Sequence, residues 1–141
     1  MRAMAVCATI AAMACLMAVG APARDGQPQG PTRLCVVWTS ADPDVAKNMC
    51  LMYALNAKKS GWFDEVHLVV WGPSARLLAE DEAIQAEVKA MQQAGAVTEA
   101  CVVCAQRYGV DQRLKELGLD VKGMGQPLSD RLKSDWKVIT F

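Results

Sequence analysis

Short segments enriched in apolar and β-branched residues recur along the chain beyond residue 33. The first two are apolar almost throughout, which is typical of parallel strands buried on both faces, whereas the fourth is less apolar and so lies nearer an edge. The pattern predicts about five strands, at residues 34–39, 65–71, 97–101, 119–125 and 136–141.

The segments between these strands have apolar residues at helical spacing, with capping residues or glycines at their ends. They predict helices at residues 43–59, 75–79, 81–94, 104–108, 111–117 and 126–133. Strands that alternate with helices in this way form βαβ units, which give a mostly parallel sheet with helices on both faces. The predicted fold class is therefore α/β, with right-handed crossovers.

The carboxyl ends of parallel strands meet at one edge of such a sheet, and ligands and chemistry gather there. In this chain those ends are residues 39–42, 71–74, 101–104 and 124–126. The third of them contains two cysteines three positions apart, and we expect it to hold the functional site.

Residues 1–23 have the pattern of a secretory signal peptide. Arg2 is their only charged residue, an apolar run extends over residues 3–19, and residues 21–23 form an Ala-Pro-Ala cleavage pattern. We therefore expect a periplasmic or secreted protein. Two alternatives stay open, namely an uncleaved membrane anchor and a lipid attached to Cys15.

The remaining chain divides into a flexible lead-in at residues 24–33, rich in Gly and Pro, and one domain at residues 34–141. The domain is long enough to bury its own core. The whole chain has 15 basic and 15 acidic residues, and the loss of Arg2 leaves the acidic residues in excess by one. No basic stripe is present, which argues against nucleic-acid binding.

We expect Cys101, together with Cys104, to be a reactive thiol. Cys101 ends a predicted strand and a helix follows it, so its sulfur would face unpaired backbone N–H groups and the positive end of the helix dipole. Both effects favour the thiolate form of a cysteine. Export also places the cysteines in a compartment that permits disulfides.

A Cys-x-x-Cys pair has several chemical interpretations. It can form a reversible disulfide, although no Trp-Cys-Gly-Pro context of the thioredoxin type surrounds it. It can bind zinc, which would require two further ligands, and the one histidine, His67, is isolated, so we expect no metal. It can accept sulfur as a persulfide on one thiol, after which the other thiol forms a disulfide. It can also consist of two buried structural thiols, as we expect for Cys35 and Cys50.

Five further residues lie near the predicted strand ends. Asp42 and Ser74 would line the pocket or cap helices, and the capping role is favoured. Gly72 and Gly125 fit tight turns, and Arg107 would help to hold an anionic sulfur species. No phosphate-loop or dinucleotide fingerprint accompanies them, so we expect no cofactor.

Several segments together resemble the DsrE/DsrF-like family, namely residues 69–74, 100–105, 108–110 and 132–141. The resemblance covers roughly residues 34–141 and implies a three-layer, flavodoxin-like (DsrE/YchN-like) domain. In members that relay sulfur, the cysteine that carries the persulfide is followed eight residues later by Gly-Val, and Cys101 with Gly109 and Val110 matches that pattern. The chain differs from those relay proteins in its signal peptide and in its second cysteine, Cys104.

The resemblance also implies a homo-oligomer, a trimer or a hexamer, and a protein that donates or accepts sulfur. Two functions are therefore considered. The first is an exported thiol protein that carries or relays sulfur, or does thiol redox chemistry, through Cys101 with Cys104; it would be a sulfur carrier or transferase more than a turnover enzyme. The second is a non-enzymatic oligomeric module that binds a small ligand or a partner. Neither requires nucleic acid or a stable membrane span after signal cleavage.

Overall fold

The computed structural model describes residues 31–141, so the predicted signal peptide and most of the predicted lead-in lie outside the described residues. Five strands form one sheet in the order β4-β3-β2-β1-β5. They are β1 (Arg33–Trp38), β2 (Glu65–Val70), β3 (Val97–Cys101), β4 (Asp120–Lys122) and β5 (Lys137–Thr140). All four strand pairings are parallel, which confirms the predicted α/β fold class and makes the sheet fully rather than mostly parallel.

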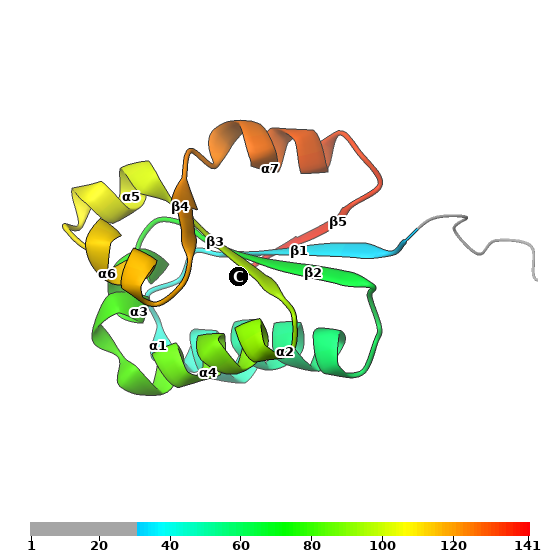
Figure 1. Ribbon diagram of the computed structural model, residues 1–141, viewed down its shortest axis with the longest axis horizontal. Helices are drawn as coiled ribbons and strands as arrows, with labels where there is room; N and C mark the ends of the chain where they lie inside the picture. The colour runs from blue at the N-terminus through cyan, green and yellow to red at the C-terminus, as the bar shows by residue number, and fades with distance from the viewer. Residues whose placement is uncertain (1–30) are drawn as a thin grey trace, which may run out of the picture.

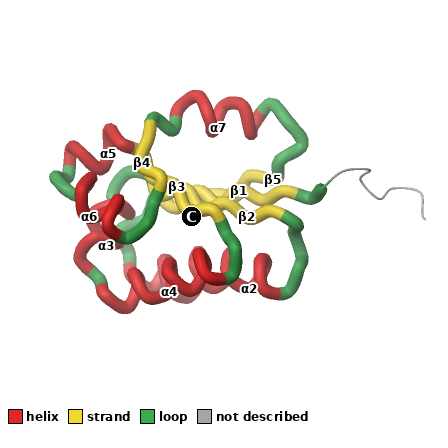
Figure 2. The backbone as a smooth tube through the Cα atoms, in the orientation of Figure 1, coloured by secondary structure: helices red, strands yellow, loops and turns green. Residues whose placement is uncertain are grey.

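Helices lie on both faces of the sheet, and the sheet is seen edge-on between them in Figures 1 and 2. One face is covered by α1 (Pro43–Val45), η1 (Ala46–Leu51), α2 (Met52–Lys59) and α4 (Glu82–Gln93), and the other by α7 (Gly125–Leu132). The remaining helices gather at the end of the sheet where the strands finish: α3 (Ser74–Glu80), α5 (Val102–Arg107) and α6 (Asp111–Glu116). The arrangement is the three-layer, flavodoxin-like one.

The helix predicted over residues 43–59 contains a π-helical segment, η1. A π-turn holds more residues than an α-turn and so rotates the side chains that follow it. Met49 and Met52, which ordinary helical spacing assigns to the core, are 53% and 50% exposed, whereas Cys50 and Leu51 are buried. The spacing of apolar residues predicts the helix but not this change of period.

The strand predicted over residues 119–125 is shorter in the structure. β4 ends at Lys122, and Gly125 begins α7 instead of closing the strand. Gly123 and Gly125 flank Met124, and glycine weakens a strand interior because it has no side chain to pack. As its lower apolar content predicts, β4 lies at an edge of the sheet.

The core has two parts, one on each face of the sheet. The larger lies under α2 and α4 and includes Leu68, Ile84 and Met91. The smaller lies under α7 and consists of buried side chains with partly buried neighbours from α7 and β5; its buried members are Cys35, Val37, Val69, Cys101 and Met124. No side chain of α7 is fully buried, so α7 is attached to the sheet less by apolar packing than the helices of the other face are.

Among residues 31–141, no helix combines the length and the apolar character that crossing a membrane requires.

We predict that Leu68→Ala lowers the free energy of unfolding by about 3 kcal/mol, because Leu68 is fully buried in the central strand and its truncation leaves a cavity. Leu132→Ala is the matched control, since Leu132 is 62% exposed on α7, and we expect a change of about 0.5 kcal/mol or less. Urea denaturation of the two variants measures both values. Equal destabilisation by the two substitutions would contradict the placement of the core.

Candidate functional site

Cys101 and Cys104 lie where β3 passes into α5, as the sequence predicts. Cys101 is the last residue of β3 and the N-cap of α5, with an extended backbone (φ −71°, ψ 113°). Its side chain makes no capping hydrogen bond to the helix. Both cysteines are free thiols. The pair therefore stands at the carboxyl edge of the sheet, at the start of a helix.

The two thiols differ in exposure. Cys101 is 6% exposed and belongs to the small core under α7, together with Val69 and Met124. Cys104, one turn into α5, is partly buried and packs against the same cluster from its edge. Solvent thus has access to Cys104 and very little to Cys101.

Neighbouring groups shift the pKa of the Cys104 thiol in opposite directions. Burial and the neighbouring Cys101 thiol raise its pKa above the ordinary value, while the Gly72 backbone N–H and the positive charge of Arg107 lower it. The net direction is upward. Cys104 is therefore mainly protonated at neutral pH, and groups that stabilise a negative sulfur already lie beside it.

A buried carboxylate lies two residues before Cys101 on β3. The Glu99 side chain is 3% exposed, and both of its oxygens are paired. Its Oε2 accepts a hydrogen bond from Arg131 Nη2 at 2.6 Å, and its Oε1 lies 2.9 Å from Lys122 Nζ. His67 Nδ1 lies 3.4 Å from Oε2. Glu99 thus connects β3 to β2, to β4 and to α7.

The charges around Glu99 keep it ionised. Burial raises the pKa of the Glu99 carboxyl, but the hydrogen bonds from His67, Lys122 and Arg131 outweigh this effect and bring the pKa to about 2. A buried carboxylate is tolerated only when it is paired in this way. Glu99 is therefore negatively charged at physiological pH, and together with His67, Lys122 and Arg131 it forms a charge cluster.

Arg131 joins this cluster to aromatic and sulfur groups. Its Nη2 lies 3.0 Å from His67 Nδ1, and its Nη1 lies 3.8 Å from Cys35 Sγ. The guanidinium stacks over Trp136 at 5.1 Å, and the His67 ring meets Trp136 edge-on at 4.6 Å. The cluster fixes α7 over the sheet face that contains Cys101.

Two of the five additional site residues act on the thiol pair. Gly72 follows β2 with φ +73°, a conformation that glycine adopts readily. Its N–H donates a hydrogen bond to the Cys104 sulfur, which lowers the pKa of that thiol. Arg107 is exposed in the last turn of α5, and its positive charge also lowers the pKa of Cys104.

The other three have structural roles in this chain. Ser74 is fully buried and donates a hydrogen bond of 2.6 Å to the carbonyl of Trp38, which ties the ends of β1 and β2 together. Asp42 is exposed and caps α1 by accepting from the N–H groups of Asp44 and Val45. Gly125 is exposed at the start of α7.

The remaining two described cysteines are buried and lie outside the pair. Burial raises the pKa of Cys50 to about 12 and also raises that of Cys35, although Arg131 opposes the effect at Cys35. Within the described part of the chain, no group of three or more His, Cys, Asp or Glu side chains is arranged to hold a metal ion.

The model of the DsrE/DsrF-like family matches residues 33–141. The chain belongs to this family. Among solved structures, a conserved protein of unknown function from Bacteroides thetaiotaomicron, BT1422, is 38% identical with a TM-score of 0.75, over 77% of this chain and 94% of that one. The YchN protein from E. coli is 16% identical with a TM-score of 0.61, over 78% of this chain and 99% of that one, and shares the fold. No curated protein matches the chain.

At the level of the DsrE/DsrF-like family, the function is of the sulfur-relay type. The Gly-Val dipeptide that follows Cys101 in this member has a physical role. Gly109 ends α5 with φ +69°, and Val110 N–H donates to the Ala105 carbonyl at 2.9 Å. These contacts end α5 after six residues, so that Cys101 and Cys104 stand on a short helix.

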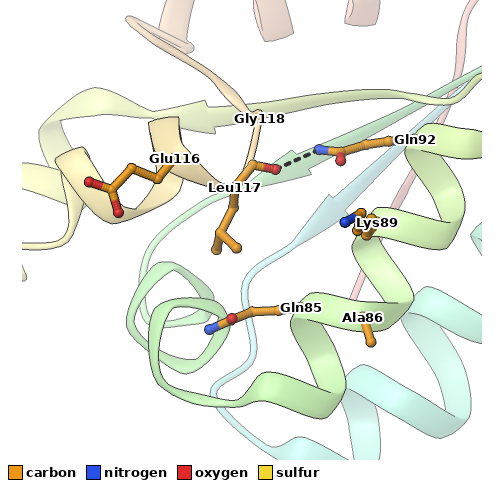
Figure 3. A pocket seen from close by; sticks show the side chains of 7 residues that line it. All are labelled: Gln85, Ala86, Lys89, Gln92, Glu116, Leu117 and Gly118. Atoms are coloured by element: carbon orange, nitrogen blue, oxygen red, sulfur yellow. Dashed lines mark hydrogen bonds between the residues drawn. The ribbon is translucent and has the colours of Figure 1, made fainter.

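A cavity of about 360 Å³ lies apart from the thiols in this DsrE/DsrF-like domain. Figure 3 shows Gln85, Lys89 and Gln92 of α4 facing the end of α6. Gln92 Nε2 donates to the Leu117 carbonyl at 3.0 Å across it. Polar and apolar groups both line it, and none of its lining residues is a cysteine.

The sequence patterns do not predict the roles of Glu99, Lys122 and Arg131. Only Glu99 has a local signal of such a role, because an acidic residue inside a predicted buried strand requires partners for its charge. Its distance of two residues from Cys101 also places both side chains on one face of the sheet. His67, predicted to be structural, does lie in a strand, but it is part of the charge cluster instead of an isolated residue.

We predict that Glu99→Gln removes an acid-sensitive part of the stability. In the wild-type protein the folded-state pKa of about 2 lies below the unfolded value of about 4.3, so the contribution is fully present above pH ~4.3 and disappears as the pH falls through about 2. We expect the variant to be less stable by about 3 kcal/mol at neutral pH, with a weaker dependence on pH between these values. Chemical denaturation at a series of pH values measures both effects. As the control we use Glu80→Gln at the exposed end of α3; a loss for Glu80→Gln as large as that for Glu99→Gln would refute the role of the cluster.

We also predict that Cys101→Ala moves the alkylation profile of Cys104 to lower pH. Cys101 raises the pKa of Cys104, so its removal lets the Cys104 thiolate form more readily. Rates of iodoacetamide modification at Cys104, read by peptide mass spectrometry over a pH series, measure the shift. Cys50→Ala, in the opposite part of the core, leaves the profile unchanged. An unchanged or upward-shifted profile in Cys101→Ala would show that the two sulfurs do not interact.

Proposed function

We propose that the protein is an exported thiol protein that carries or relays sulfur as a persulfide, or does thiol redox chemistry, through Cys101 with Cys104. The observation that carries this proposal is the contact of two free thiols at the carboxyl end of β3, at the start of α5. Export is supported by the signal-peptide pattern of residues 1–23.

Several features favour sulfur transfer as the chemistry. Gly72 N–H and Arg107 supply a hydrogen bond and a positive charge to the Cys104 sulfur, and both stabilise an anionic sulfur species. Cys104 is accessible and Cys101 lies beside it, so a persulfide on one sulfur can be attacked by the other. The family-level function is of the same type.

We further propose that the protein forms a homo-oligomer. The proposal is supported by large apolar side chains on its described surface, including Met49, Met52 and Trp62 at 53%, 50% and 55% exposure, because exposed apolar surface favours protein–protein contact. The ring centroids of Trp62 and Tyr53 lie 6.1 Å apart, so part of this surface is aromatic. Sedimentation velocity measures the oligomeric state.

The second candidate function is a binding module without thiol chemistry. The cavity between α4 and α6 favours it, because its size is in the range of small-ligand sites and its lining includes the amides of Gln85 and Gln92 with Lys89. In that case the thiols would be structural and the ligand would bind at a site that contains neither Cys101 nor Cys104.

One experiment separates the two candidates. The reduced protein is exposed to a sulfane-sulfur donor and analysed by intact mass, and the free thiols are then alkylated. We expect the Cys101–Cys104 segment to be modified before Cys35 and Cys50, and the chain to gain one sulfur atom or to lose two hydrogen atoms as a disulfide.

The double variant Cys35→Ala with Cys50→Ala is the matched control and should retain this reactivity. The double variant Cys101→Ala with Cys104→Ala should lose it. Slow, equal labelling of all four thiols, without any gain of sulfur, would reject the thiol function and favour the binding module.

A further inference from the structure

The two cysteines of the pair are not equivalent toward a molecule that arrives from solvent. Cys101 is 6% exposed, and Val69 of β2 and Met124 share its buried cluster, with Leu128 of α7 packed against it. Cys104 lies one turn further on, partly buried, at the edge of the same cluster. A donor therefore meets Cys104 first.

The groups around Cys104 also fit the anionic form of the incoming sulfur. The Gly72 N–H at the end of β2 donates a hydrogen bond to this sulfur, and the exposed Arg107 guanidinium attracts its negative form. Arg107, being exposed, is free to attract a carboxylate on the donor as well. Cys101, in contrast, has apolar neighbours and the Cys104 thiol.

We propose that Cys104 accepts sulfane sulfur from a low-molecular-weight persulfide that carries a carboxylate, and that Cys101 then resolves the Cys104 persulfide. This assignment rests on the proposed function of the pair and deepens it by naming the order of the two thiols and the class of donor. It reverses the order suggested by the family pattern, in which the cysteine eight residues before Gly-Val receives the sulfur.

In the first step, the Cys104 thiolate attacks the terminal sulfur of the donor. The S–S bond of the donor breaks, a new S–S bond to Cys104 forms, and the donor leaves as a thiolate that takes up a proton. No net oxidation occurs, because one S–S bond replaces another.

In the second step, the Cys101 thiolate attacks the Sγ atom of the Cys104 persulfide. The bond from Sγ to the terminal sulfur breaks, hydrosulfide leaves, and a Cys101–Cys104 disulfide forms. The two cysteines lose two electrons and the sulfane sulfur gains them. The Cys-x-x-Cys spacing at a helix start is one that allows such a disulfide.

The test uses the reduced wild-type protein and the variants Cys101→Ala, Cys104→Ala and Cys50→Ala, each treated with glutathione persulfide. Cys101→Ala should accumulate one added sulfur atom on Cys104 and release no sulfide. Cys104→Ala should take up sulfur about tenfold more slowly, because Cys101, Cys35 and Cys50 are all buried. The wild-type protein and Cys50→Ala should release one hydrosulfide per chain and end with two hydrogen atoms fewer.

Fragment-ion mass spectrometry of the wild-type protein after a short pulse locates the added sulfur without any variant, so a variant that folds poorly does not decide the outcome. Sulfur found first on Cys101, or uptake by Cys104→Ala as fast as by Cys101→Ala, overturns the assignment and leaves the proposed function standing. Absence of sulfur uptake in every protein overturns this assignment and, with it, the sulfur-carrying form of the proposed function.

Discussion

The paired carboxylate of Glu99 is the constraint on which the rest of the thiol-bearing face depends. It lies inside a parallel sheet, where an unpaired charge would be very costly, and it is compensated by Arg131 from α7 and Lys122 from β4. α7 has no fully buried side chain of its own, and Arg131 joins it to β3 through the Glu99 carboxylate. Because α7 covers the small core around Cys101, the charge cluster also determines how little of that thiol meets solvent.

The sheet supplies a rigid edge, β3 delivers one thiol into a packed environment, and the short helix α5 carries the second thiol to the boundary with solvent. Two thiols with different access and different surroundings suit a reaction in two stages better than two equivalent thiols would. The apolar neighbours of Cys101 keep water away from it, while Gly72 and Arg107 provide the polar contacts at Cys104.

Much of this fold could be predicted from the sequence, because buried parallel strands and capped helices leave strong local patterns. The apolar runs predict β1 and β2 to within a residue at each end, and the cysteine pair is predicted at the β3–α5 junction. The π-helical segment η1 and the early end of β4 could not be predicted, since both depend on how neighbouring elements pack. The Glu99–Arg131 contact joins residues 32 positions apart, and no local sequence pattern predicts it. The unequal burial of the two thiols is likewise a product of α7 folding back over the sheet.

Whether this edge of the sheet handles sulfur is tested most directly by the chemical state of the thiols in the protein isolated from its native source. Free thiols are trapped by alkylation at lysis, before any reductant is added, and the segment that contains Cys101 and Cys104 is analysed by mass. We expect a fraction of the chains to carry an extra sulfur atom or an internal disulfide in this segment, while Cys50 is unmodified. A population in which both members of the pair are always plain thiols, whatever the supply of sulfur to the cells, would contradict this expectation.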